Sequence, residues 1–143
     1  MPASPLLLTL WLLVLAGCFF SLWKGGPPER LGAWVVLANL LLLMLVETFL
    51  PVEVQPVSEL VIDGLTAVAL LGVVLVYGSL WLGGAMLLYA VQFTLHAYYF
   101  VTERRSNDRL HAIVNNVDFM GIIICLVIGA AVAWRARLRT SAA

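Results

Sequence analysis

The stretch from Leu60 to Val101 reads LVIDGLTAVALLGVVLVYGSLWLGGAMLLYAVQFTLHAYYFV, and its only Asp, Glu, Lys or Arg residue is Asp63. It is about twice as long as the roughly 20 apolar residues that a helix needs to cross a bilayer. Gly78-Ser79 lies near its middle, and glycine commonly marks a break between helices. We therefore predict two membrane-spanning helices, at about 60–77 and 81–101, that fold back on each other.

Three further apolar segments extend this pattern toward both ends of the chain. They predict spans at about 5–23, 31–50 and 110–134. The segment 24–30 reads KGGPPER, and its two glycines and two prolines are typical of a turn. The sequence thus predicts an all-α transmembrane bundle of five helices, with four as the alternative, in a single domain covering 1–143.

Composition places the chain in lipid rather than in water. Hydrophobic residues make up 63% of the 143 residues, charged residues only 11%, and the mean hydropathy is +1.03. A soluble globule of this size needs more polar surface. The formal net charge is zero, so there is no basic field of the kind that binds nucleic acid. We predict an integral membrane protein without a soluble domain that does not bind nucleic acid.

The distribution of Lys and Arg favours an N-terminus outside and a C-terminus inside. This orientation places five basic residues on the cytoplasmic side and three on the outer side. The inner residues are Lys24, Arg30, Arg135, Arg137 and Arg139, and the outer residues are Arg104, Arg105 and Arg109.

The segment Leu15-Ala16-Gly17-Cys18 has the form of a bacterial lipobox, in which the cysteine after a cleaved signal peptide is lipidated. No Lys or Arg precedes it and apolar residues continue to Trp23, so we expect an uncut first helix. Cys18 and Cys125 lie in separate spans without metal-binding or redox spacing, and we interpret both as packing residues.

Polar side chains interrupt the predicted spans close to one membrane face. In an up-and-down bundle the second helix ends, the third begins, the fourth ends and the fifth begins at that face. Polar and ionisable residues within a membrane are costly and mark functional sites by default. At about 100° per residue, the polar residues of the fourth helix share one stripe, and those of the fifth share one face. The candidate cluster is Glu47, Asp63, Gln92, His96, Tyr99, His111, Asn115 and Asp118.

The polar face of the fifth helix continues into a ridge of small residues. Small residues at this spacing let two helices approach closely, which drives helix association in lipid. The candidate packing residues are Gly121, Cys125, Gly129 and Ala133.

Four chemical interpretations of the polar cluster stay open. Hydrogen bonds among its members would fix the register of the bundle. Alternatively, Asp63, His96 and Asp118 would carry protons or a cation. Metal binding lacks the short ligand spacings of known sites, and catalysis lacks a Ser or Cys nucleophile beside His96 in the same leaflet. The sequence assigns no metal and no other cofactor.

The turn Gly25-Gly26-Pro27-Pro28-Glu29-Arg30, the start Asp63-Gly64-Leu65 of the third helix and the position of His96 resemble small polytopic bacterial inner-membrane proteins that carry no assigned activity. This resemblance covers most of the chain and implies a multi-pass protein of the bacterial inner membrane, without implying a chemistry. The run from His111 to Asp118 is similar to the R-A-x-x-N-x-x-E run of glutathione-using microsomal transferases. It opens the last helix here and both charged ends are replaced, so no activity is carried over.

We predict that the chain is an accessory or assembly component of a membrane complex. Its partners are the lipid bilayer and other membrane helices, from further copies of the chain or from a different protein. Small size, absent soluble domains and absent catalytic motifs favour this function. The alternative is a proton- or cation-translocating subunit. An open polar cavity at Asp118 would favour transport, and polar groups bonded to one another would favour the structural function.

Overall fold

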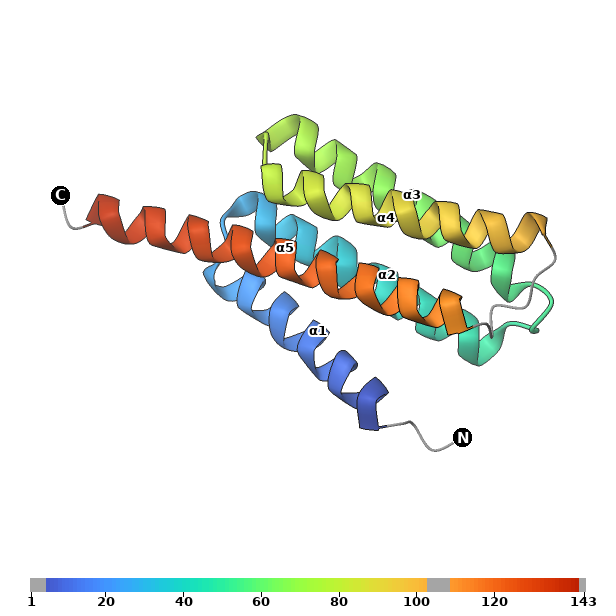
Figure 1. Ribbon diagram of the computed structural model, residues 1–143. Helices are drawn as coiled ribbons and strands as arrows, with labels where there is room; N and C mark the ends of the chain where they lie inside the picture. Colours follow the sequence, from blue (N-terminus) through green and yellow to red (C-terminus); the bar gives the residue numbers. More distant parts are fainter. Residues whose placement is uncertain (1–4, 103–108, 142–143) are drawn as a thin grey trace.

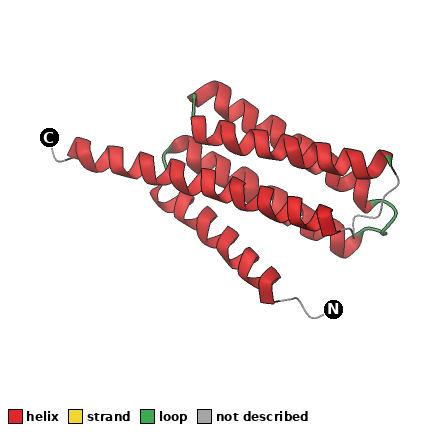
Figure 2. Ribbon diagram, in the orientation of Figure 1, coloured by secondary structure: helices red, strands yellow, loops and turns green. Residues whose placement is uncertain are grey.

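A computed structural model describes residues 5–102 and 109–141 of the chain, and the side chains from residue 9 onward. The described residues form five helices and no strands, which confirms the predicted fold class (Figures 1 and 2). Four of the helices, α2 to α5, are long and apolar enough to cross a membrane. The chain is therefore a helical membrane protein. The helices are α1 (Pro5–Lys24), α2 (Pro27–Phe49), α3 (Gln55–Tyr77), α4 (Leu80–Val101) and α5 (Arg109–Ser141).

The helix ends follow from local turn chemistry. Gly78 has a φ of 64°, a left-handed conformation that glycine adopts without strain, and it ends α3 at the predicted break. Helix α2 begins at Pro27, four residues before the predicted span at 31, because proline suits the first helical turn. Its Glu29 carboxylate accepts a hydrogen bond from the Gly26 N–H at 3.0 Å and caps the helix.

The five helices form a ring in chain order. Each helix packs against the next, and α5 closes the ring against α1. Helix α2 also contacts α4 and α5 across the ring, whereas α1 contacts neither α3 nor α4 among the described residues. Figure 1 shows α1 diverging from the bundle toward its N-terminus, and α5 extending beyond the other helices at its C-terminus.

Small residues bring the helices together in the core. The predicted ridge on α5 faces α4 of the same chain: a Cβ added at Gly121 would lie 2.8 Å from Leu88, and one at Gly129 would lie 3.2 Å from Trp81. Cys125 Sγ lies 3.1 Å from the Cβ position of Gly84. The fourth ridge residue, Ala133, lies next to the α1–α2 turn, with its Cβ 3.7 Å from the Cβ position of Gly26.

Large apolar side chains cover the outside of the bundle. Leu75, Val76 and Leu80, near the α3–α4 turn, are 77%, 76% and 87% exposed. In water such a surface would be unfavourable, and in a bilayer it faces lipid or other membrane helices. Cys18 is fully buried in the middle of α1, in agreement with its interpretation as a packing residue.

Candidate functional site

Asp63 on α3 is the centre of a buried hydrogen-bond network. It is fully buried, and its two carboxylate oxygens contact two different helices. Asn39 Nδ2 on α2 donates to Oδ1 at 3.1 Å, and His96 Nδ1 on α4 lies 2.7 Å from Oδ2. The Asn39 amide also donates to Thr66 Oγ1 at 3.0 Å, and the Tyr89 hydroxyl donates to Asn39 Oδ1 at 3.4 Å. One carboxylate thus joins α2, α3 and α4.

A set of stacked rings connects this network to α5. The rings of His96 and His111 have centroids 5.3 Å apart and planes at 28°, and Tyr99 meets His111 edge-on at 4.8 Å. Because Asp63 holds His96 through Nδ1, the imidazole keeps one orientation against His111. The carboxylate that joins α2, α3 and α4 thus also orients the ring that packs against the first turn of α5.

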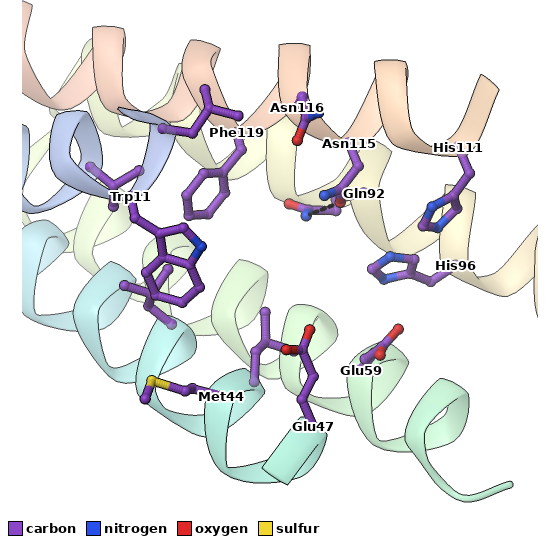
Figure 3. Close-up of a pocket in the computed structure, with 14 residues that line it drawn as sticks. Trp11, Met44, Glu47, Glu59, Gln92, His96, His111, Asn115, Asn116 and Phe119 are labelled. Carbon is purple, nitrogen blue, oxygen red and sulfur yellow. Dashed lines mark hydrogen bonds between the residues drawn. The ribbon is translucent and has the colours of Figure 1, made fainter. Parts of the chain in front are cut away.

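A cavity of about 330 Å³, partly open to the outside, lies beside the two histidines (Figure 3). All five helices contribute to its wall, although α3 contributes only Glu59. The lining residues are Leu10, Trp11, Val14, Leu40, Leu43, Met44, Glu47, Glu59, Gln92, His96, His111, Asn115, Asn116 and Phe119.

The wall of this cavity has a polar part and an apolar part. In Figure 3 the carboxylate of Glu59 lies near the two histidines and that of Glu47 lies toward the middle of the cavity, whereas Trp11 and Phe119 lie at the other end. The remaining α1 and α2 lining side chains are apolar, so the apolar part is formed mainly where α1 approaches α2 and α5. A cavity with separate polar and apolar parts suits a molecule with the same division.

Gln92 on α4 lines the cavity and is left with an unused acceptor. Its Nε2 donates to Asn115 Oδ1 at 2.7 Å. Its Oε1 is buried and accepts no hydrogen bond from any described residue. Figure 3 shows this oxygen on the side of the amide away from Asn115. A buried acceptor without a donor is costly, so this position favours an occupant that donates a hydrogen bond.

The structure brings together most of the residues that the sequence singles out. Five of them line the cavity, Asp63 lies behind His96, and Tyr99 packs against His111. Asp118 is 5% exposed and does not line the cavity, and its Oδ2 accepts no hydrogen bond from the described part of the chain. The five lining members are Glu47, Gln92, His96, His111 and Asn115. The predicted outer basic residues Arg104 and Arg105 lie outside the described residues.

The geometry gives little support to metal binding. Within residues 5–102 and 109–141, no three His, Cys, Asp or Glu side chains are close enough to hold a metal ion together. His96 has a carboxylate at its Nδ1, an arrangement that also occurs behind metal-bound histidines, but only in the company of further ligands.

Sequence reasoning missed several residues of the site. Trp11 and Phe119 read as ordinary apolar residues of their helices, and no local signal distinguishes a cavity wall from a helix contact. Asn116, which is outside the candidate cluster, also lines the cavity. Asn39, the lone amide of its span, did carry a signal for an interhelical hydrogen bond, and its partners are Asp63, Thr66 and Tyr89.

Comparison with known proteins finds no matching protein-family model, no similar curated protein and no similar solved structure. The site is therefore interpreted from its own chemistry.

Proposed function

We propose that the chain is an accessory or assembly component of a membrane complex, in which the buried polar groups hold the helices in register. The observation that carries this proposal is the full burial of Asp63, with one carboxylate oxygen bonded to Asn39 and the other to His96. A carboxylate that carries a proton or cation must be reached by it. Here both oxygens are already bonded to neighbouring helices.

The outer surface supports the same function. A bundle whose polar groups bond internally presents apolar side chains outward, and these faces are available to lipid or to partner helices. The small-residue ridge of α5 is occupied by α4, α2 and the α1–α2 turn of the same chain, so a partner would bind at another face.

The proposed location is the bacterial inner membrane, with the N-terminus outside and the C-terminus inside. The five basic residues near the α1–α2 turn and at the end of α5 support this orientation. In this orientation the cavity lies near the outer surface. Cysteines introduced at Glu53 and Thr140 test it: an impermeant maleimide added to intact cells should label the first and not the second.

Proton or cation translocation is the second candidate. Glu47, Glu59 and His96 line one partly open cavity, which supports entry of a cation from one face. Flux through proteoliposomes separates the two functions, with His96→Ala and Asp63→Asn as variants. The accessory function predicts no flux above empty vesicles for the native chain. Flux that both variants abolish while the bundle stays folded would establish transport.

A positive test of the accessory function is purification from native membranes in mild detergent. We expect a membrane protein to co-purify in a fixed ratio. Recovery of the chain alone, or only as copies of itself, in several mild detergents would contradict a role in a mixed complex.

A further inference from the structure

We propose that the cavity beside His96 and His111 binds an amphiphilic amine, a molecule with an ammonium head that carries N–H donors and a single apolar tail. The inference goes beyond the accessory function and does not depend on it. It rests on the charge of the cavity, its hydrogen-bond acceptors and its apolar part.

The charge of the cavity favours a cation. Two carboxylates, Glu47 and Glu59, line it, and none of the described residues in its wall is Lys or Arg. His96, which would contribute positive charge if protonated, is paired with the buried carboxylate of Asp63 at 2.7 Å. An anionic head would therefore meet carboxylates without a compensating guanidinium or ammonium group, whereas an ammonium head would be attracted.

The hydrogen-bond inventory favours a donor. Gln92 lines the cavity and is 3% exposed, and its buried Oε1 has no donor among the described residues. Glu47, which is exposed, and Glu59, which is half-buried, add two carboxylates to the cavity wall. A primary ammonium group supplies three donors, whereas a quaternary ammonium group supplies none. The acceptors of Gln92, Glu47 and Glu59 therefore favour a primary ammonium group over a quaternary one.

The apolar part of the cavity accommodates a tail. In Figure 3, Trp11 and Phe119 lie on the side of the cavity away from Glu59 and the histidines. Leu40, Leu43 and Met44 of α2 add further apolar lining. At about 330 Å³ the cavity is at the lower end of the about 300–1,000 Å³ of small-molecule sites. This space suits a head group and part of one chain, and it is too small for a whole two-chain lipid.

Such a molecule would enter beside the N-terminal half of helix α1. It diverges from the bundle toward its N-terminus and contacts neither α3 nor α4 among the described residues (Figure 1). Leu10, Trp11 and Val14 of this half of α1 line the cavity. A tail dissolved in the bilayer therefore reaches the apolar part from the lipid, while the head stays near the membrane face.

Binding is tested with the purified full chain in phosphatidylcholine nanodiscs. The probe is radiolabelled dodecylamine, which is protonated at neutral pH, and empty nanodiscs measure partitioning into lipid. We expect saturable binding of about one amine per chain. Dodecyltrimethylammonium should compete at least about tenfold less well, and laurate should not compete. Non-saturable binding, or equal competition by laurate, would overturn the proposal.

Matched variants locate the binding. Glu59→Gln and the double variant Glu47→Gln/Glu59→Gln remove charge from the cavity, and Gln92→Met removes the unused acceptor. Glu53→Gln, on the exposed segment between α2 and α3, is the control. We expect affinity to fall about tenfold in Glu59→Gln, further in the double variant and by a few fold in Gln92→Met. Unchanged affinity in the double variant, with the fold intact, would also overturn the proposal.

The source of the amine is distinguished by adding phosphatidylethanolamine to the nanodiscs. Displacement of dodecylamine would identify the amine head of a bilayer lipid as the occupant, with its tails in the surrounding lipid. Undiminished binding would identify a free single-chain amine. Both outcomes support the site and assign its ligand to a different pool.

Discussion

The two ends of the bundle are packed by different means. At the closed end, marked by Gly25, Gly32 and Gly129, three glycines lie against neighbouring atoms: a Cβ added at Gly25 would overlap the carbonyl oxygen of Ser21, one at Gly32 would overlap Leu82, and one at Gly129 would lie 3.2 Å from Trp81. The cavity end, marked by His96 and His111, instead encloses about 330 Å³ of open space. Close helix contact therefore ends where large polar side chains replace small ones.

This difference separates two requirements of a small membrane bundle. Helices in lipid gain no hydrophobic stabilisation from each other, so van der Waals contact at small residues provides much of the association energy. Polar side chains cannot pack so closely, but their hydrogen bonds select one register. In this chain the closed end provides tight packing, and the Asp63 network provides register next to the cavity.

The largest expected effect comes from breaking the network at the cavity end. Asp63→Leu leaves the buried Asn39 amide and His96 without their shared acceptor, and we expect a loss of about 3 kcal/mol in unfolding free energy. Unfolding by dodecyl sulfate in mixed micelles, followed by circular dichroism, measures it. Asp63→Asn keeps an acceptor oxygen and should lose less. Equal stability of Asp63→Leu and the native chain would show that the network is dispensable.

The next effect comes from filling the closed end. Gly25→Ala places a methyl group against the backbone of Ser21, which cannot move aside as a side chain can, and we expect a loss of about 2 kcal/mol. The control is Gly72→Ala on α3, where nothing lies within 4 Å of the added Cβ. That variant should be neutral or slightly more stable, because alanine favours a helix over glycine. Similar losses in both variants would show that the contact with the Ser21 backbone does not determine the cost at Gly25.

A smaller effect is expected from the hydrogen bonds of the closed end. Ser21 Oγ is buried, lies 2.9 Å from the carbonyl oxygen of Gly17 and 3.3 Å from that of Leu126, and so connects α1 to α5. Ser21→Ala should cost about 0.5–1 kcal/mol. Ser58→Ala, at an exposed hydroxyl bonded within its own helix, should change stability by less than half as much.

The smallest effect is expected at the edge of the closed end. Arg137 donates hydrogen bonds to the carbonyl oxygens of Lys24 and Gly25 and joins α5 to the α1–α2 turn. Its surroundings are exposed, so Arg137→Gln should cost at most about 0.5 kcal/mol. The matched control is Arg139→Gln, and the same denaturation compares the two. A loss as large as that of Gly25→Ala would show that the α5 extension contributes to the fold as much as the core does.

Much of this fold could be predicted from the sequence, because each helix is encoded locally. Apolar length predicts the spans, and Gly78-Ser79 predicts the tight turn between α3 and α4. The shared membrane face of the polar residues follows from counting the helices. The helix ends were harder to predict. The sequence places Pro27 and Pro28 in a turn, but they form the first turn of α2.

The contacts between helices could not be predicted, because helical phase shows which residues share a face and not which helix that face meets. The Gly121 ridge was compatible with a partner, and it packs on Leu88 of α4 instead. Asp118 shares a face with Asn115, yet only Asn115 lines the cavity. The cavity itself depends on the divergence of α1 from the other helices. This divergence is a property of the whole bundle, and no single residue of α1 predicts it.

Helix α5 has a mechanical consequence that follows from its length. Its 33 residues rise about 50 Å, more than the about 40–45 Å of a bilayer with its head groups. Its last turns carry Arg135, Arg137 and Arg139, which lipid phosphates attract, and its first turns carry His111 and Asn115 at the cavity. One stiff helix thus connects the arginines to the cavity, so a change in bilayer thickness that shifts the arginines should also shift one wall of the cavity.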